Sequence, residues 1–298
     1  MVGMPELPDI RIYVDALRER VEGHTFDGMR IATPFVVRSV SPRPAEIGGL
    51  AVVGVGHQAK RIVIALQQDI GIFIHLMIAG RLHWKEKGAV LKGRNHLAAL
   101  DFDSGTLILT EAGTKRRASI HLVRGTEGAS EFDRGGLDPL TTTEAEFRER
   151  LSKENHTLKR ALTDQKLLAG IGNAYSDEIL LAARLSPFKP TQRLTHDEWQ
   201  RLYTATRDTL NLWIDRLRQE VGSDFPKKVT AFREGMAVHG RYRKPCPVCG
   251  SPVQRIVYAE NEANYCARCQ TGERLLADRS LSRLLKDNWP KKLEDLEE

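Results

Sequence analysis

The N-terminal segment Met4-Pro5-Glu6-Leu7-Pro8 contains residue types that could carry out covalent chemistry. If translation begins at Met4 and this methionine is removed, Pro5 has a free secondary amine. A terminal α-amine titrates near ~8, so much of it is unprotonated at neutral pH and can add to an aldehyde to give an iminium. Glu6 is placed to transfer protons. A structural alternative is that Pro5 and Pro8 only stiffen the segment before a helix. Taken alone, the segment favours that alternative.

All four cysteines lie close together, in the pairs Cys246-Pro-Val-Cys249 and Cys266-Ala-Arg-Cys269. Two C-x-x-C pairs separated by residues 250–265 predict a two-stranded ribbon that closes a tetrahedral site for one zinc ion. Four thiolates fill every coordination position, so the site is predicted to be structural. The basic residues of the segment before the ribbon favour nucleic acid as its partner.

A second motif, Leu168-Ala-Gly-Ile-Gly-Asn173, lies between two helical patterns. Its glycines allow a tight reversal with exposed backbone N–H groups. Asn173 is predicted to cap the next helix, and Asp177 and Glu178 suit the N-terminal end of that helix. A helix N-terminus opened in this way can bind phosphate. A simple helical hairpin explains these residues equally well.

Length and composition indicate a globular protein with room for two domains, because the chain has 298 residues, 41% of them hydrophobic and 28% charged. Its formal net charge of +6 permits a polyanionic partner. Charged residues from Asp9 onward interrupt any signal peptide, and the apolar stretch at 70–79 is too short to span a membrane. We therefore expect a cytoplasmic protein without disulfides.

The pattern of apolar residues predicts a helix at 8–21 and then a region of strands. The strands are expected at 31–40, 51–55, 61–66, 71–76, 97–102 and 107–109, with a hairpin turn at 103–105. A polar, glycine-bearing linker follows. Helices are expected at 143–153, 158–168, 174–184 and 195–220, a ribbon strand at 253–258, and a helical pattern at 275–289.

Three features together resemble one family of proteins. They are Pro5-Glu6-Leu7-Pro8, the segment Gly170-Ile-Gly-Asn173-Ala-Tyr between two helices, and the cysteine ribbon ending in Cys269-Gln270. Their order and spacing resemble the formamidopyrimidine-DNA glycosylase/endonuclease VIII family along nearly the whole chain, from residue 5 to residue 270. Each motif alone is modest, but the combination is specific.

The resemblance implies an α+β fold. It implies an N-terminal helix with an antiparallel β-sandwich domain, and a C-terminal helix–two-turn–helix domain with the zinc ribbon, with DNA bound in the cleft between the domains. We place the β-domain at 1–123, the linker at 124–142, the helical domain at 143–240, the ribbon at 241–270 and a helical tail at 271–298. A monomeric repair glycosylase with abasic-site lyase activity on double-stranded DNA is implied.

The resemblance also implies roles for individual residues. Pro5 resembles the terminal proline that attacks the deoxyribose C1′, and Glu6 resembles the acid that protonates the opening sugar. Lys60 resembles a β-domain lysine of the catalytic site that contacts phosphate beside the lesion. Asn173 resembles the asparagine that holds the same backbone, and Lys159 is expected alongside it. Without the resemblance, both lysines would be interpreted as solvated surface residues.

The chain departs from the family at its start and in its ribbon. Met1-Val2-Gly3 precede Met4, and if they persist Pro5 has no nucleophilic nitrogen; we favour a true start at Met4. The place of the arginine that binds phosphate in the family ribbon holds Asn261, which donates hydrogen bonds without a charge. Arg255 is a candidate to compensate, and both residues are predicted to contact DNA.

The chain also departs from the family in the loops that replace the flipped base. Ile78 stands where the family has a methionine. Arg116 corresponds to the wedge arginine, but Arg117 takes the place of an aromatic residue. Both arginines are predicted to contact DNA, since arginine can stack on a base. The preferred opposite base therefore cannot be inherited from the family. The segment 222–241 is short for the loop that covers oxidised purines, so the lesion spectrum cannot be inherited either.

Three interpretations remain open from the sequence. The first is a glycosylase and lyase acting on oxidised or ring-opened bases through Pro5. The second is a non-catalytic protein of the same fold that binds damaged DNA. The third, an unrelated zinc-ribbon protein, would not account for Pro5-Glu6 or for the glycine-asparagine turn.

Overall fold

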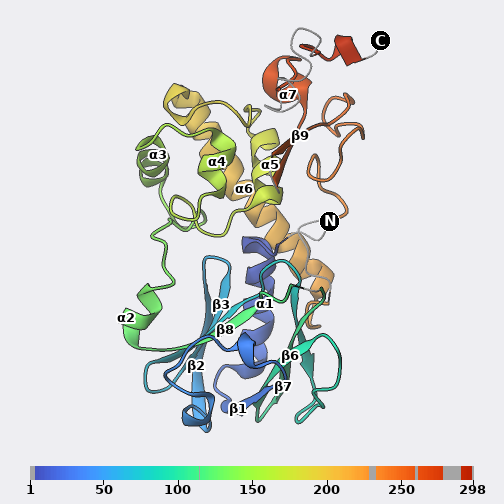
Figure 1. The fold of residues 1–298 in the computed structure, drawn as a ribbon. Coiled ribbons are helices and arrows are strands. Elements are labelled where there is room, and N and C mark those ends of the chain that lie inside the picture. The colour runs from blue at the N-terminus through green and yellow to red at the C-terminus, as the bar shows by residue number, and fades with distance from the viewer. Residues whose placement is uncertain (1–3, 114, 228–232, 259–260, 278–289, 297–298) are drawn as a thin grey trace. The chain divides into compact units, whose positions relative to one another are not determined.

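The computed structural model describes residues 4–113, 115–227, 233–258, 261–277 and 290–296. The chain forms two compact units (Figure 1). Unit 1 contains residues 1–135 and 213–231, and unit 2 contains residues 136–212 and 232–298. The long helix α6 (His196–Val221) begins in unit 2 and ends in unit 1. The sequence had assigned 213–231 to the helical domain.

Unit 1 is built on one eight-stranded sheet in the order β5-β7-β6-β1-β2-β3-β4-β8. All neighbouring strands are antiparallel. The strands are β1 (Thr25–Ile31), β2 (Leu50–Gln58), β3 (Arg61–Leu66), β4 (Ile70–His75), β5 (Gly80–Lys85), β6 (His96–Phe102), β7 (Gly105–Glu111) and β8 (Ser119–Arg124). Short helical turns η1 (Pro34–Val36) and η2 (Pro44–Glu46) and the short helix α2 (Gly125–Ser130) lie between or after them.

Helix α1 (Leu7–Val21) packs against β2 and β3 of this sheet (Figure 1). Proline is well tolerated in the first turn of a helix, which accounts for Pro8. Ile10, Tyr13 and Leu17 recur at helical spacing and are completely buried in the core. The Tyr13 hydroxyl accepts a hydrogen bond from the Leu82 N–H at 3.2 Å. The predicted helix at 8–21 is confirmed.

The predicted strands are confirmed except in one region. Residues 31–40 do not form a strand. Strand β1 ends at Ile31 and the turn η1 follows from Pro34, since proline fixes φ and lacks the N–H that a strand donates. The predicted hairpin is confirmed, because Phe102 pairs with Gly105 across a two-residue loop. The sequence missed β1, β5 and β8, whose polar residues weaken the strand pattern.

The segment after α6 packs within unit 1 through Phe225. The Phe225 ring lies 5.7 Å from that of Tyr13 and 6.5 Å from that of Trp84, measured between centroids. The guanidinium of Arg20 lies over the same ring and donates to the Ser223 carbonyl at 2.7 Å. These apolar contacts explain why this segment belongs to the unit of the sheet.

Unit 2 contains α3 (Glu144–Ser152), α4 (Leu158–Thr163), α5 (Asn173–Ala182), the first part of α6, and a turn η3 (Thr191–Arg193). It also contains the ribbon strands β9 (Gln254–Tyr258) and β10 (Asn261–Tyr265), which pair in antiparallel fashion, with α7 (Ala267–Thr271) and η5 (Glu294–Leu296). Helix α4 ends earlier than predicted, because Asp164 accepts the Lys166 N–H and starts a turn there. Most of the predicted helix at 275–289 lies outside the described residues.

In the part of the chain that the structure describes, no helix combines the length and the apolar character needed to cross a membrane.

Candidate functional site

Pro5 and Glu6 lie immediately before α1, and both are buried. Glu6 is only 3% exposed, which is unusual for a carboxylate. Its backbone is extended, and its N–H donates to the Asp9 carboxylate at 2.9 Å. Asp9 is completely buried, and its hydrogen bond to the Glu6 N–H holds the segment that contains Pro5 and Glu6 in place. From the sequence, Asp9 was interpreted as one of the charged residues that interrupt a signal peptide. Its position three residues after Glu6 is the signal of a capping interaction.

Lys60 lies in the two-residue turn that joins β2 to β3, where Gln58 pairs with Arg61. Its neighbour in this turn, Ala59, has a φ of 51°, which permits the tight reversal. Burial of its ammonium group lowers the pKa of Lys60, while the nearby charges of Glu6 and Asp9 act in the opposite direction. Lys60 therefore lies near enough to Glu6 and Asp9 for their charges to act on it, and its phosphate contact stays a prediction.

More cationic groups surround this turn. The pKa of His75 is lowered to about 4, first by burial and then by the charges of Arg61, Lys60, Arg134 and His121. Burial also lowers the pKa of Arg61, and Arg134 adds to the effect. The charged groups acting on His75 are all cationic, so a polyanion would relieve their repulsion. The sequence analysis assigned no role to this group, although Arg61 adjoins Lys60.

The loop between β4 and β5 is a tight turn with Ile78 at its surface. The Gly80 N–H donates to the Leu76 carbonyl at 2.9 Å. A Cβ on Gly80 would lie 2.2 Å from that oxygen, so only glycine fits. Met77 has a φ of 53°, and Ile78 is 43% exposed. The loop therefore presents an apolar side chain at the surface of unit 1.

Arg116 and Arg117 are both exposed on a segment that other residues hold in place. The carboxylate of Glu111 accepts the N–H groups of Arg117 and Ala118 at 2.8 and 2.9 Å. The Arg116 guanidinium donates to Thr33 Oγ1 at 3.3 Å and to the Arg94 carbonyl. Both arginines are therefore accessible to a partner, and their predicted contact with DNA stays a prediction.

In unit 2, Asn173 is the first residue of α5, and Gly172 is its N-cap. The expectation that Asn173 caps this helix is therefore wrong by one position. Its side chain is half-buried, and Gly170 in the preceding turn has a φ of 87°. The backbone thus makes the tight reversal that the two glycines predicted, and Asn173 lies where this reversal meets the helix.

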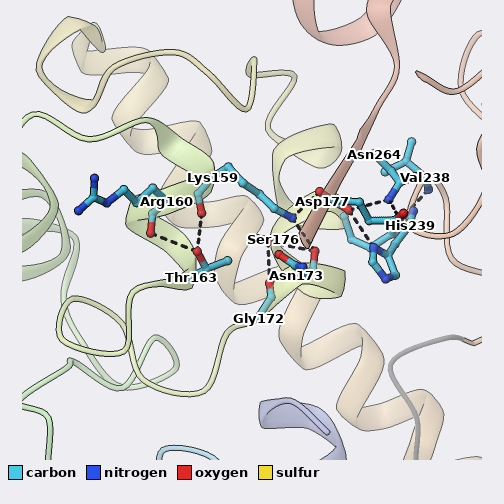
Figure 2. A network of polar contacts seen from close by, with 12 residues as sticks. Lys159, Arg160, Thr163, Gly172, Asn173, Ser176, Asp177, Val238, His239 and Asn264 are labelled. Carbon is cyan, nitrogen blue, oxygen red and sulfur yellow. Dashed lines mark hydrogen bonds and ion pairs between the residues drawn. The ribbon is translucent and has the colours of Figure 1, made fainter. Parts of the chain in front are cut away.

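Lys159 is not a surface residue, and this corrects its predicted contact with DNA. It is 2% exposed, and its Nζ lies 2.5 Å from Asp177 Oδ1 and donates to the Asn173 carbonyl at 2.7 Å (Figure 2). The ammonium is satisfied inside the protein, so it has no free face for a phosphate. Asp177 and Glu178 are also buried, and they hold neighbouring segments instead of only interacting with the helix dipole.

The four cysteines converge as predicted. The sulfur atoms of Cys246, Cys249, Cys266 and Cys269 all lie within 4.8 Å of one another. The Sγ atoms of Cys249 and Cys266 are 3.4 Å apart. Tetrahedral zinc with Zn–S bonds of ~2.3 Å places sulfurs about 3.8 Å apart, so these residues fit one zinc ion. The ligand set is complete without water, which makes the site structural.

The two predicted DNA contacts of the ribbon differ in what surrounds them. The Arg255 guanidinium lies 4.6 Å from the centre of the Tyr242 ring and 3.9 Å from the Glu262 carboxylate. Its side chain is 37% exposed, so one face remains accessible. Asn261 begins β10, but its side chain lies outside the described residues.

Comparison with known families agrees with this arrangement. Residues 4–118 match the formamidopyrimidine-DNA glycosylase N-terminal domain, 136–222 match the H2TH domain of the same enzymes, and 243–272 match a zinc finger found in FPG and IleRS. The matches together cover strands β1 to β7 of the sheet, the Asn173 turn and the cysteine ribbon.

Two of the relatives match nearly the whole chain, and a third matches about half of it. The formamidopyrimidine-DNA glycosylases of Chloroflexus aggregans and Thermus thermophilus are each 31% identical, over 90% of this chain and 98% of their own length. An uncharacterized formamidopyrimidine-DNA glycosylase-like protein of Mycobacterium tuberculosis is 40% identical over 51% of this chain and 94% of its own length.

Solved structures show the same fold. A complex of Lactococcus lactis Fpg with DNA containing an abasic site has a TM-score of 0.78 at 24% identity, covering 89% of this chain and 99% of that one. A complex of MutM with carbocyclic 8-oxo-G DNA has a TM-score of 0.77 at 23% identity, covering 90% of this chain and all of the other. The fold and the cysteine site define a two-unit protein with an H2TH motif and a zinc ribbon. The chain belongs to the formamidopyrimidine-DNA glycosylase family.

Proposed function

We propose that this protein is a DNA base-excision repair glycosylase that removes oxidised or ring-opened bases and then cleaves the abasic site as a lyase. The observation that carries the proposal is the placement of Pro5 and Glu6, buried together before α1, with the ammonium of Lys60 close enough to interact with Glu6. A buried carboxylate beside a nucleophile and a cation is suited to acid–base chemistry.

The proposed chemistry uses one nucleophile for both steps. The free amine of Pro5 forms a bond to C1′ of the deoxyribose, and the damaged base leaves with the electrons of the glycosidic bond. Glu6 donates a proton to the ring oxygen as the sugar opens, leaving an iminium between Pro5 and C1′. The iminium acidifies C2′, and loss of a C2′ proton expels the 3′ phosphate. Expulsion of the 5′ phosphate by a second elimination can follow.

The proposal requires a chain that starts at Met4 and loses that methionine, because Pro5 is otherwise held in a peptide bond with no basic nitrogen. A base inside a duplex is out of reach of Pro5, so the nucleotide must be flipped outward. In this proposal Lys60 and Asn173 contact backbone phosphates, while Ile78, Arg116 and Arg117 occupy the space that the flipped base leaves. The protein acts as a monomer in the cytoplasm, on double-stranded DNA.

Borohydride trapping tests the proposal. Borohydride reduces an iminium to a stable amine, so protein that starts at Met4 should become covalently joined to abasic-site DNA, and digestion should place the adduct on Pro5. The control is protein that retains Met1 to Gly3, which should trap far less. A lysine amine could give weak residual trapping in Pro5 variants. Equal trapping by both proteins would exclude Pro5 as the nucleophile and leave Lys60 as the next candidate.

A second experiment separates the enzyme from a binding protein of the same fold. Incision of duplexes that carry different oxidised or ring-opened bases, each opposite several bases, would identify the lesion. Tight binding to an abasic-site duplex without incision or trapping by the Met4-started protein would mean that it only binds damaged DNA.

A further inference from the structure

Lys159 links helix α4 to the first residue of α5. Its ammonium lies 2.7 Å from the Asn173 carbonyl oxygen and 2.5 Å from Asp177 Oδ1 (Figure 2). Lys159 is 2% exposed and Asp177 is 1% exposed. Because a buried ammonium must be fully compensated, the position of the Asn173 backbone depends on the position of Asp177.

Asp177 is in turn held from the side of the ribbon. Its Oδ2 accepts from His239 Nδ1 at 2.8 Å and from Asn264 Nδ2 at 3.2 Å. His239 belongs to the segment before the ribbon, and Asn264 belongs to β10. The two oxygens of one carboxylate therefore divide between two regions, with the Asn173 turn on one side and the ribbon on the other.

Glu178, the next residue of α5, strengthens the same connection. Its carboxylate accepts the backbone N–H groups of Ala237, Val238 and His239 at 2.7, 2.9 and 2.9 Å. Burial raises the pKa of Glu178, and these three hydrogen bonds oppose that effect. Two successive acidic residues thus join α5 to residues 237–239.

The ribbon end of this connection adjoins the zinc ligands. Asn264 lies two residues before Cys266, on the strand that leads into the second cysteine pair. Gln270 accepts the Cys266 N–H at 2.8 Å and donates to the Leu185 carbonyl, beyond the end of α5, at 2.9 Å. Ordering of the cysteines by zinc therefore orders the groups that hold Asp177.

We propose that Lys159 and Asp177 are positioning residues that carry the zinc-ordered position of the ribbon to Asn173. Zinc then sets the geometry of the Asn173 turn without touching it. This inference rests on the proposed phosphate contact of Asn173, and it explains why a buried lysine occurs beside that residue. The chain of contacts runs from the cysteines through Asn264, Asp177 and Lys159 to the Asn173 carbonyl.

The first test needs no DNA. Hydrogen exchange is measured on the full-length protein before and after a chelator removes zinc. We expect the amides of residues 172–178 to exchange about tenfold faster after chelation, with those of α3 (Glu144–Ser152) unchanged. In Lys159→Met, chelation should still affect residues 237–239 but should add little at 172–174. Unchanged exchange at 172–178, or equal acceleration in α3, would overturn the inference whether or not the protein cuts DNA.

The second test measures binding to an abasic-site duplex. Lys159→Met should weaken binding about tenfold through loss of a charge-assisted hydrogen bond to the Asn173 carbonyl. The matched control is Lys166→Met. This substitution removes the same charge from an exposed position of the same unit. Because Lys159→Met leaves Asp177 unpaired, a Lys159→Met/Asp177→Asn variant is included; it should regain stability without regaining affinity.

A double-mutant cycle distinguishes positioning from general loss of stability. In an Asn173→Ala protein, adding Lys159→Met should cause little further loss of affinity. Lys159 is proposed to act only by positioning the Asn173 side chain on a phosphate, and that side chain is already absent. Additive losses would overturn the positioning role. If the unmodified protein does not bind the duplex at all, the proposed function fails, and the exchange experiment alone decides the coupling.

Discussion

In unit 1, burial lowers the pKa of Lys60, although Glu6 and Asp9 lie near enough to oppose this effect. In unit 2, Lys159 is more deeply buried, but its ammonium lies 2.5 Å from Asp177 and also bonds a carbonyl. The charge of Lys60, together with that of Arg61, helps to lower the pKa of the neighbouring His75, whereas the surroundings of Lys159 supply acceptors. We therefore expect the first lysine to bind an anion, whereas the second is already paired within the protein.

The comparison indicates that two buried lysines can differ in whether the protein itself supplies acceptors for the ammonium. A cation that lacks full compensation gains most from a phosphate, because binding replaces the water that folding removed. A cation that is already paired contributes by fixing the backbone around it. The predictions below test whether unit 1 supplies the uncompensated charge and unit 2 the fixed backbone.

The largest effect is expected from the zinc site. Cys246→Ser or Cys269→Ser should abolish DNA binding, because ligation and folding of the ribbon are coupled and the ribbon holds Asp177. Metal analysis of the purified protein should find about one zinc ion per chain, and binding is measured on an abasic-site duplex. If protein without zinc still binds this duplex, DNA binding does not depend on a zinc-ordered ribbon.

Glu6→Gln should be nearly as severe, but only for one of the two activities. A neutral amide at position 6 cannot donate a proton to the sugar, so excision of a damaged base should fall by about 10²-fold or more. The Pro5 amine remains, and borohydride trapping of an abasic site should persist. Both are measured on the Met4-started protein.

Glu19→Gln is the matched control, since Glu19 is exposed on the same helix. It should retain both activities. Unchanged base excision in Glu6→Gln would show that another group delivers the proton.

The sequence was sufficient to predict the fold wherever motifs and burial agree. The helix at the start, the hairpin at 103–105 and the cysteine ribbon follow from local rules of proline placement, turn chemistry and metal spacing. The strand predicted at 31–40 was wrong. Its apolar residues suggested a strand, but Pro34 begins a helical turn and cannot donate a strand hydrogen bond. Strand β5 was missed because Arg81, His83 and Lys85 interrupt its apolar residues.

Site residues were harder to predict where their environment comes from distant segments. From the sequence alone, Lys60 and Lys159 would both be interpreted as solvated surface residues. Their difference depends on Asp177 in α5 and on Glu6 before α1, which only the fold brings to them. Asn264 has a similar explanation, because its hydrogen bond to Asp177 spans 87 positions of sequence. No local pattern could have revealed that contact.

A titration of His75 tests the uncompensated charge in unit 1. The folded state should hold its pKa at about 4, well below the ordinary value of 6.5. The unfolded chain then binds more protons in this range, so the His75 contribution to stability is complete above pH 6.5 and is lost as the pH falls toward 4. NMR of the ring protons measures this pKa directly. A value near 6.5 would contradict the burial of His75 among cationic groups.

Lys60→Ala extends this measurement to binding. Removing one of the repelling charges should raise the pKa of His75. The same change should weaken binding to an abasic-site duplex by more than it lowers the free energy of unfolding, and should reduce the salt dependence of binding. Lys92→Ala, at an exposed lysine of the same unit, is the control and should change neither quantity much. If Lys60→Ala binds the duplex with full affinity, the proposed contact between Lys60 and a phosphate is wrong.

The smallest effect is expected at Asn261, where the chain lacks the arginine of the family ribbon. Asn261→Arg should strengthen binding to an abasic-site duplex by a few-fold at most, because it adds a charged donor while Arg255 already lies on the paired strand β9. Val248→Arg is the control for a non-specific gain in charge. Val248 is 59% exposed between Cys246 and Cys249, and the second cysteine pair already has Arg268 at the corresponding position.

A gain in Asn261→Arg that Val248→Arg does not reproduce would show that position 261 faces a phosphate. Equal gains would reflect net charge alone, and both should then disappear at high salt. Unchanged or weaker binding in Asn261→Arg would mean that another residue already occupies the place of that arginine. To test whether Arg255 is that residue, the effect of Arg255→Ala on binding is measured in the original protein and in Asn261→Arg. If Arg255 compensates for the missing arginine, its removal should weaken the original protein more than it weakens Asn261→Arg.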